Sequence, residues 1–456
     1  MLIRKPFRFS FSLLLCLVFI SIGHQGLCAD SSSKSSPDYK ELKLFRQVME
    51  IVRKNYVKEV TDKELIQGAI SGMLQSLDPH SSYLTEDMFK ELQVETKGEF
   101  GGLGIEITLD GGILTVVSPI EDTPAFKAGI KPGDKIIKIN GEPTKSITLH
   151  SAVQQMRGPK GTKVTLTIMR EGFKKLKDFT ITRDIIHVHS VKKEALEPGY
   201  GYVKIVSFQE TTDTDLMAAI KDLENNDTSK SADKKGKKDD PPMKGMILDL
   251  RNDPGGLLDQ AVKVANLFID KGLIVYTDGR VKDQRMEFRA SPAGTHYKFK
   301  LAVLINEGSA SASEIVAGCL QDHDRALIFG TKSFGKASVQ TIIPLDNGSG
   351  LRLTTAYYYT PKGRHIQKTG ILPDVDLKAE IQKREEEEIA AEECKDGKKV
   401  EKKQPPGAGR FGKETKADLE KDLVVKKALE WLKSDVSVKK FKQEHEKPAA
   451  NTTASK

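Results

Sequence analysis

Residues 301–320 of the chain read LAVLINEGSASASEIVAGCL. An apolar strand from Leu301 to Ile305 runs into a turn of small residues, and a helix with apolar side chains begins at about Ser311. A strand, a small-residue turn and a helix form the repeating unit of α/β sheets, which place their sites at the carboxyl ends of the strands. This stretch therefore predicts an α/β fold with a site near Ser311.

A second unit of the same kind lies upstream. Met246–Leu250 is an apolar strand, residues 251–256 read RNDPGG, and an amphipathic helix follows from about Leu258. Both glycine-containing turns thus follow buried strands, and we expect them to meet at one edge of the sheet.

Lys336 stands in a third segment, between Gly335 and a predicted strand. The alternation of strands and helices covers about residues 201–377 and is interrupted at 226–243 by an insert rich in Lys and Asp. Such a composition cannot bury a core, so we expect a solvated loop there.

Composition limits the class of protein. The chain has 456 residues, of which 38% are hydrophobic and 30% charged. It is long enough for two or three domains and too polar for a multispanning membrane protein. Its net charge of +8 comes from lysines gathered in low-complexity stretches, without interleaved aromatic residues, which argues against nucleic acid as a partner.

The N-terminus has the pattern of a secretory signal peptide over residues 1–29. Basic residues precede an apolar run from Phe9 to Ile22, and a small residue, Ala29, ends the segment. We therefore expect an exported protein of the periplasm or cell envelope. Two alternatives stay open: an uncleaved signal that anchors the chain in the membrane, and a lipoprotein acylated at Cys28.

Cysteine and histidine usage predicts neither a disulfide framework nor a metal site. Four cysteines are present; Cys16 and Cys28 would leave with the signal, Cys319 lies on an apolar helical face and Cys394 in a charged tail. No group of His, Cys and carboxylate residues has the spacing of metal ligands. We expect no cofactor.

Helical periodicity marks an N-terminal region over residues 38–96, broken by a turn at Asp78–Ser81. From residue 97 to 183 the pattern changes to short strands and Gly-rich turns. Predicted strands cover 104–109, 113–117, 135–139 and 164–170, and predicted helices cover 124–128 and 149–156.

The turn Gly101-Gly102-Leu103-Gly104 and the run AGIKPGD at 128–134 make this second region resemble a PDZ domain. Glycines let consecutive backbone N–H groups point into one concavity, which suits a terminal carboxylate. The resemblance implies that Leu103, Gly104 and Ile105 bind a peptide tail, which adds a strand beside Ile105–Leu109. The alternative is that the glycines form only a tight turn.

Several ordered motifs together resemble the C-terminal processing peptidases, or tail-specific proteases. The resemblance extends from about residue 40 to 376 and rests on these stretches: LDPHS at 77–81, LDLR at 248–251 with PGG at 254–256, GSASASEI at 308–315, FGK at 334–336 and VQ at 339–340. It implies a multidomain α/β (α+β) protein with a ClpP-like or crotonase-like protease core over residues 184–380.

The resemblance also implies the catalytic roles. It assigns the nucleophile to Ser311, the general base to Lys336 and the residue that orients the base to Gln340. Ala337 departs from the family pattern, which usually has glycine there. It also implies that substrates are proteins recognised through their C-terminal tails, with movement of the PDZ domain gating the site.

The residues fit that chemistry. A serine hydroxyl needs a base, and a lysine serves as one only where burial disfavours its charged form. Phe334 and Val339 could supply the apolar setting. Backbone N–H groups at a helix start stabilise negative charge, so Ala312 and Gly256 are the candidate oxyanion donors, with Gly255 as the alternative to Gly256.

Other interpretations were weighed. Ser309, Ser311 and Ser313 could be helix N-caps. Residues 322–324, Asp-His-Asp, could supply a triad, but they lie about 18 Å along the helix from Ser311, so we interpret them as solvated charges at the helix end. A catalytically silent PDZ scaffold and a crotonase-like acyl-transfer enzyme are the alternative functions.

The C-terminal region, residues 381–456, divides into a charged linker and an amphipathic helix that carries Leu419, Leu423, Ala428 and Leu432. We expect its apolar stripe to pack against the N-terminal helices of the same or another subunit. A homodimer and an adaptor or regulator protein are the further expected partners.

Overall fold

The computed structural model describes residues 37–120, 122–225, 243–292, 297–396 and 415–445. Contacts divide the chain into two units, residues 1–69 and 70–456, each of which is described by itself. The expected signal peptide and residues 226–242 of the expected insert lie outside the described residues. Among the described helices, none is both long enough and apolar enough to cross a membrane.

The first unit contains helix α1 (Pro37–Asn55) and the start of α2 (Asp62–Gln75). Arg53 near the end of α1 pairs with Asp62 at 3.4 Å. Large apolar side chains on α1 are exposed, among them Leu42, Phe45, Val48 and Ile51. The expected helices are thus present, and α1 presents an apolar surface to solvent.

The second unit begins with the end of α2, strand β1 (Ser82–Leu84) and helix α3 (Glu86–Lys97). The purely helical prediction for residues 38–96 is wrong at β1, which pairs antiparallel with β18 (Gly350–Tyr359) in the protease core. A three-residue strand is too short to show a period of two in the sequence.

The PDZ domain is a sheet with two helices. Its strands follow the order β3-β4-β5-β7-β8, with β6 paired to β5, so β3 is an edge strand. The elements are β3 (Ile105–Asp110), β4 (Ile113–Pro119), α4 (Pro124–Lys127), β5 (Lys135–Ile139), β6 (Glu142–Pro143), α5 (Leu149–Met156), β7 (Lys163–Met169) and β8 (Lys177–Thr182). The expected strands and helices are found to within two residues, whereas β6 and β8 were not predicted.

Two strands flank the PDZ domain in the sequence. β2 (Glu99–Gly102) pairs antiparallel with β9 (Asp184–His187), and Gly102 is the partner of Asp184. The chain therefore enters and leaves the PDZ domain at the same place.

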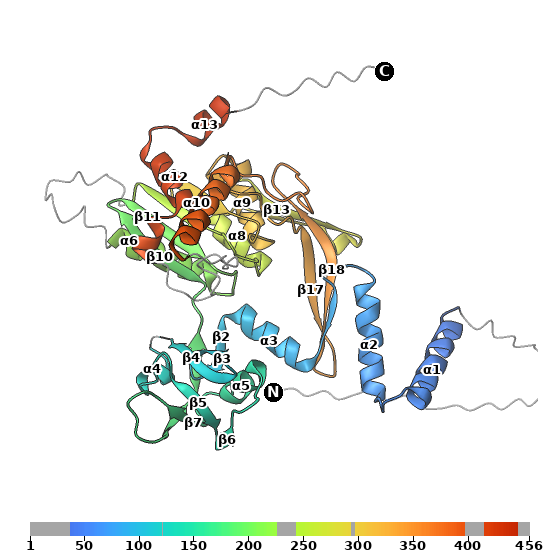
Figure 1. Ribbon diagram of the computed structural model, residues 1–456. Coiled ribbons are helices and arrows are strands. Elements are labelled where there is room, and N and C mark those ends of the chain that lie inside the picture. The colour runs from blue at the N-terminus through green and yellow to red at the C-terminus, as the bar shows by residue number, and fades with distance from the viewer. Residues whose placement is uncertain (1–36, 121, 226–242, 293–296, 397–414, 446–456) are drawn as a thin grey trace, which may run out of the picture. The chain divides into compact units, whose positions relative to one another are not determined.

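The expected protease core is built on a six-stranded sheet in the order β10-β11-β12-β15-β16-β19. Figure 1 labels the first two of these strands, β10 and β11. β10 is antiparallel to β11, and the remaining neighbours are parallel. The strands are β10 (Val191–Glu197), β11 (Tyr200–Ile205), β12 (Gly245–Asp249), β15 (Lys300–Ile305), β16 (Leu327–Gly330) and β19 (Val375–Asp376). The α/β prediction is confirmed.

Helices cover both faces of this sheet. Alternate strand residues, such as Leu248 and Val303, pack with α6 (Thr212–Asn225), α8 (Leu258–Asn266) and α9 (Ala312–Asp322). The intervening residues, such as Ile247 and Leu304, face the other side. A second sheet has the strand order β1-β18-β13-β14, and β17 pairs with β18. Its strands not yet introduced are β13 (Leu273–Gly279), β14 (Met286–Arg289) and β17 (Ser338–Pro344), and the short helix η1 (Lys282–Gln284) precedes β14.

The C-terminal helices cover the second face of the core sheet. They are α10 (Lys378–Asp396), α11 (Lys416–Leu419), α12 (Leu423–Lys433) and α13 (Val438–His445). The expectation that the stripe around Ala428 packs on the N-terminal helices is wrong: Val424, Val425, Ala428 and Leu432 pack on Ile247, Ala302 and Leu304. A mostly parallel sheet needs cover on both faces, and this stripe supplies it on one of them.

Candidate active site

Ser311 occupies a strained backbone position between β15 and α9. Its φ and ψ angles are 55° and −111°, a region that non-glycine residues rarely adopt and that costs about 1–3 kcal/mol. Ser311 stands at the N-cap position of α9, and its N–H donates to the Glu314 carboxylate at 2.9 Å as in a capping box, whereas the hydroxyls of Ser309 and Ser313 donate to the carbonyls of Leu250 and Asp253. Ser311 is therefore the N-cap of α9 by position, but its backbone lies outside the extended region that N-cap residues usually adopt.

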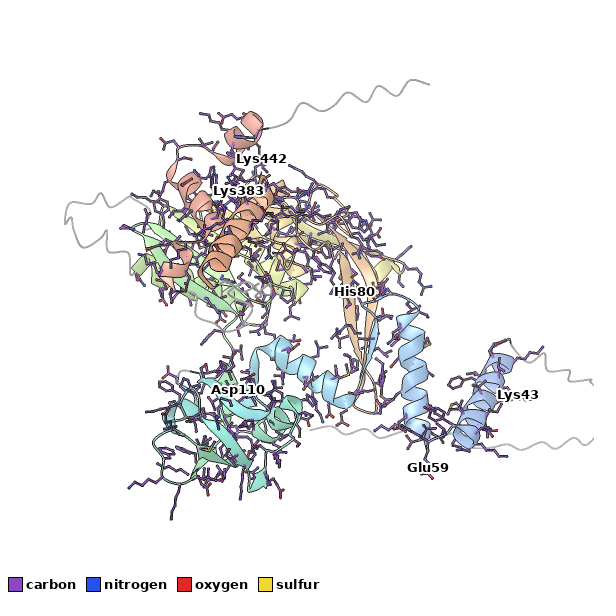
Figure 2. All side chains as sticks on the ribbon, viewed as in Figure 1. Lys43, Glu59, His80, Asp110, Lys383 and Lys442 are labelled. Carbon is purple, nitrogen blue, oxygen red and sulfur yellow. The ribbon has the colours of Figure 1, made fainter. Side chains whose placement is uncertain are left out.

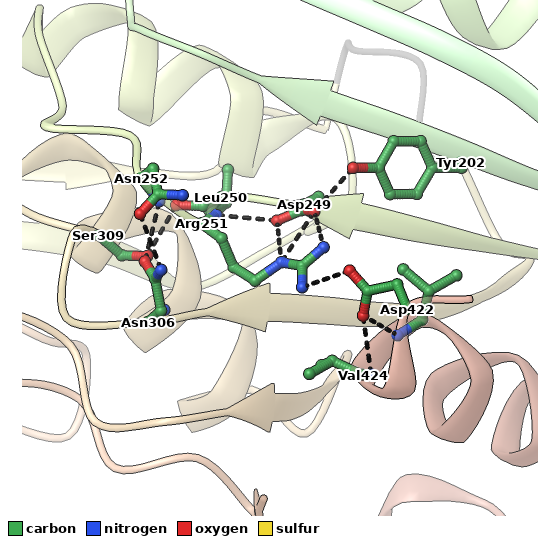
Figure 3. Close-up of polar contacts among 10 residues, drawn as sticks. Tyr202, Asp249, Leu250, Arg251, Asn252, Asn306, Ser309, Asp422 and Val424 are labelled. Atoms are coloured by element: carbon green, nitrogen blue, oxygen red, sulfur yellow. Dashed lines mark hydrogen bonds and ion pairs between the residues drawn. The ribbon is translucent and has the colours of Figure 1, made fainter. Parts of the chain in front are cut away.

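The turn at residues 251–256 is fastened to the Ser311 turn (Figure 3). Asn252, whose φ is 59°, and Asn306 exchange hydrogen bonds of 2.9 Å. The carbonyl of Asp253 accepts from the Ala310 N–H at 3.0 Å and from the Ser313 hydroxyl at 3.1 Å. The expected meeting of the two turns is thus observed.

The two glycines of this turn have different surroundings. A Cβ on Gly255 would lie 2.8 Å from the Cβ of Ser311, so only glycine fits there. The Gly255 N–H donates to the Asp253 carboxylate at 2.8 Å and is thereby occupied. Neither the Gly256 N–H nor the Ala312 N–H donates to another residue within the described part of the chain. This difference favours Gly256 over Gly255 as an anion-binding donor.

Lys336 lines the same cleft as Ser311, Gly256 and Gln340. Burial lowers the pKa of its ammonium, the positive charge of Arg352 lowers that pKa further, and the carboxylate of Glu314 opposes both. The expected direction is therefore found, but the expected source is partly wrong. Phe334 is 59% exposed, so it contributes little, while Val339 is half-buried against the core.

Glu314 joins the Ser311 and Lys336 backbones. It is fully buried, and one carboxylate oxygen accepts from the N–H groups of Ser311 and Lys336, both at 2.9 Å. The other oxygen accepts from the Ser333 hydroxyl at 2.5 Å and the Gly335 N–H at 2.7 Å. Burial raises the pKa of this carboxyl, and the four hydrogen bonds oppose the rise.

Tyr358 connects the same two residues through their carbonyls. From β18 its buried hydroxyl lies 3.0 Å from the Ser311 carbonyl oxygen and 2.5 Å from that of Lys336. Burial raises the pKa of Tyr358 well above its usual value, so the hydroxyl keeps its proton and donates. The prediction from sequence missed both Glu314 and Tyr358; only Glu314 left a signal, as the fourth residue of an S-x-x-E capping box.

Gln340 lies on β17, and its amide is oriented by hydroxyl groups. Its Nε2 lies 2.8 Å from Ser338 Oγ and 3.4 Å from Thr354 Oγ1. Thr354 in turn donates to Asp78 at 3.2 Å. The neighbouring His80, labelled in Figure 2, has a lowered pKa because it is partly buried and near the charge of Lys336. The Asp78–Ser81 turn is therefore linked to Gln340 through Thr354.

Residues 322–324, expected to be solvated charges at the end of α9, are instead structural. Asp322 is buried and pairs with Arg364 at 2.6 Å. His323 contacts the Leu273 carbonyl at 2.7 Å, and Asp324 pairs with Lys442 of α13 at 2.8 Å. These contacts engage all three side chains at the far end of α9.

No group of three or more His, Cys, Asp or Glu residues in the described ranges has the geometry to hold a metal ion. Cys319 is buried in α9, and burial raises the pKa of its thiol far above the usual value. A thiol in that state is unreactive.

The PDZ groove lies between the free edge of β3 and helix α5. Leu103 is buried beneath it, Ile105 begins the edge strand, and α5 contributes Val153 and Met156. Gly104 has a φ of 75°, and a Cβ there would lie 2.3 Å from Thr123. Glycine is therefore required at the turn before the edge strand.

Comparison with known proteins identifies the family. Residues 199–377 match peptidase family S41, residues 91–169 match the PDZ domain, and residues 22–88 match the activating protease CtpB N-terminal domain. The carboxy-terminal-processing protease of Bartonella bacilliformis is 53% identical over 337 residues, covering 74% of this chain and 75% of that one.

The carboxy-terminal processing protease CtpA of Bacillus subtilis is 39% identical over 350 residues, covering 76% of this chain and 71% of that one. Among solved structures, the photosystem II D1 C-terminal processing protease is 30% identical, with a TM-score of 0.41, and the match covers 75% of this chain and 93% of that one. From the two sequence relatives and the S41 match, the chain belongs to the carboxy-terminal processing proteases of peptidase family S41.

Proposed function

We propose that this protease is a serine endopeptidase in which Ser311 is the nucleophile, Lys336 the general base and Gln340 the residue that orients the base. One observation carries the assignment: Glu314 and Tyr358 hold the backbones of Ser311 and Lys336 together, through both N–H groups and both carbonyls. A structural serine and a surface lysine would not need two shared, buried partners.

We infer a reaction that passes through an acyl-enzyme. Neutral Lys336 Nζ takes the proton of Ser311 Oγ as Oγ attacks the substrate carbonyl carbon. The oxygen of that carbonyl becomes negative and receives hydrogen bonds from the Ala312 and Gly256 N–H groups. Lys336 then gives its proton to the departing amine, which leaves an acyl-serine. Water, deprotonated by Lys336, hydrolyses this ester and restores Ser311.

The neutral base depends on the electrostatics of the cleft. Burial and Arg352 lower the Lys336 pKa, which increases the fraction of neutral lysine near neutral pH. We therefore expect activity to rise with pH through the pKa of Lys336, at a pH below the usual value for a lysine.

The substrates proposed are proteins with free C-terminal tails. The edge strand β3 offers unpaired backbone groups to an added strand, and the groove toward α5 is apolar. We propose that the terminal carboxylate lies at the Leu103-Gly104-Ile105 turn and that the PDZ domain also regulates cleavage. Amidating the tail of one substrate should slow its cleavage by the intact enzyme and have no effect after deletion of the PDZ domain.

Export to the periplasm or cell envelope belongs to the same proposal, based on the pattern of residues 1–29. N-terminal sequencing of the mature protein tests it: a start near Asp30 supports cleavage, and a start at Met1 supports an anchor. Self-association, and an adaptor protein, are further proposals. The exposed apolar residues of α1 support the first, and light scattering of the purified chain would test it.

The decisive experiment measures cleavage of an unstructured protein with a free C-terminus. Ser311→Ala and Lys336→Ala should each abolish cleavage, because members of one catalytic unit fail together. Lys332→Ala is the matched control, since Lys332 lies on the same segment and is exposed. Cleavage by folded Ser311→Ala protein would reject Ser311 as the nucleophile, whereas a folded wild-type protein that cleaves nothing would favour a silent scaffold or an acyl-transfer role for the core.

A further inference from the structure

The turn that carries Gly256 begins at a charged network at the end of β12 (Figure 3). Asp249 is fully buried there, and its carboxylate accepts from the Arg251 N–H at 2.8 Å and from the Tyr202 hydroxyl at 2.7 Å. The Arg251 guanidinium contacts both carboxylate oxygens, at 3.0 Å through Nε and 2.6 Å through Nη2. Arg251 thus neutralises the buried charge of Asp249 and is the first residue of the 251–256 turn.

The remaining arm of this guanidinium reaches the C-terminal helices. Arg251 Nη1 lies 2.8 Å from Asp422 Oδ2, and the two side chains are only 16% and 25% exposed. The other oxygen of Asp422 caps α12, accepting from the N–H groups of Val424 at 2.8 Å and Val425 at 3.1 Å. Asp422 therefore fixes the start of α12 and one end of the turn at once. A pair with this little exposure is also poorly screened by solvent.

The turn has little freedom to move without disturbing Ser311. The Cβ position of Gly255 already lies 2.8 Å from Ser311 Cβ and 2.8 Å from the Ala312 nitrogen. The Asn252–Asn306 bonds and the Asp253 carbonyl fasten the turn to the Ser311 turn, whereas Arg251 fastens it to α12. The asparagine and Asp253 contacts fix the 251–256 turn against the Ser311 turn. The contact between Arg251 and Asp422 connects both turns to α12, a helix on the opposite face of the sheet.

We propose that Asp422 is a positioning residue of the peptidase: through Arg251 it holds the 251–256 turn so that the Gly256 N–H meets the negative charge of the transition state. This inference rests on the proposed function. It assigns the C-terminal helices, which lie beyond the S41 match at residues 199–377, a part in the active site. The contribution concerns the transition state, so it should affect kcat rather than KM.

The test compares three variants of the full chain. Asp422→Asn keeps a good N-cap for α12 but removes the charge that faces Arg251. Lys433→Gln is the matched control, because it breaks another ion pair between α12 and the core, Lys433 with Glu197 at 2.9 Å, away from the turn. Asp422→Glu restores the charge. We expect Asp422→Asn to lower kcat about tenfold with little change in KM, Lys433→Gln to have no effect and Asp422→Glu to recover part of the loss.

A second measurement does not depend on proteolysis. Hydrogen exchange in peptides that cover residues 251–256 should be faster by about tenfold in Asp422→Asn and unchanged in Lys433→Gln. Unchanged kcat and unchanged exchange in Asp422→Asn would overturn the inference, as would equal changes in both variants. If the wild type cleaves nothing, the proposed function fails, and the exchange measurement still decides whether Asp422 holds the turn.

Discussion

Replacing Glu314 by glutamine should weaken catalysis and, at the same time, move its pH dependence toward acid. Each carboxylate oxygen accepts two hydrogen bonds, and a glutamine amide can accept at only one of the two positions. The less costly orientation turns the NH2 group toward Ser333 and Gly335. The Ser333 hydroxyl can rotate to accept, which leaves the Gly335 N–H without an acceptor.

The magnitude follows from that count. One buried N–H without a partner costs about 1–3 kcal/mol, and the remaining bonds lose the strengthening that a charged acceptor gives. We expect the free energy of unfolding to fall by about 2–4 kcal/mol. If half of that loss reflects misplacement of Ser311 against Lys336, kcat falls about tenfold.

The pH dependence separates this role from a purely structural one. The Glu314 carboxylate raises the Lys336 pKa, so its removal lowers that pKa and exposes a neutral base at lower pH. The acid limb of the kcat profile should therefore move to lower pH while the maximum falls. Glu307→Gln is the control, since Glu307 is an exposed glutamate of the same turn whose carboxylate accepts from the Thr331 hydroxyl. An acid limb that stays in place or moves to higher pH in Glu314→Gln would refute the reasoning.

Three further outcomes are expected. Tyr358→Phe should lower kcat several-fold, because the Ser311 and Lys336 carbonyls lose their shared donor; stopped-flow acylation would detect it, and an unchanged rate would contradict it. Gly255→Ala should abolish cleavage, because a Cβ would meet Ser311 and the φ of 96° disfavours alanine; a variant with wild-type kcat would rule out this close approach. Arg352→Gln should raise the Lys336 pKa by removing a neighbouring positive charge, and so move the acid limb of kcat to higher pH; a limb displaced toward acid would exclude Arg352 as a source of the shift.

The sequence was most informative where short-range pattern and chemistry coincide. The strand at 301–305 and the helix after Ser311 follow from apolar periodicity, and the structure has them as β15 and α9. The meeting of the Ser311 and Gly255-Gly256 turns follows from the rule that parallel strands end at one edge. The assignment of Lys336 to the same cleft came from family resemblance, because nothing local in the sequence indicates that distance.

Contacts between distant segments could not be predicted from one sequence. An amphipathic stripe such as that of α12 indicates that one face of the helix is buried. It does not indicate which surface buries it, because every candidate partner surface is apolar. Tyr358 is an example at a single position. It stands in a run of three tyrosines, and only the pleat of β18 buries it while leaving Tyr357 43% exposed. The opposite error concerns Phe334. This aromatic residue was expected to contribute to an apolar setting, but the fold leaves its side chain exposed to solvent.

The pairing of β2 with β9 determines how the PDZ domain is joined to the rest of the chain. Gly102 and Asp184 are partners in that antiparallel pair, so their Cα atoms lie about 5 Å apart. The whole PDZ domain is therefore an insertion whose two ends meet at a neck no wider than a hairpin turn. Any domain whose termini are equally close could take its place without changing the length of either flanking strand.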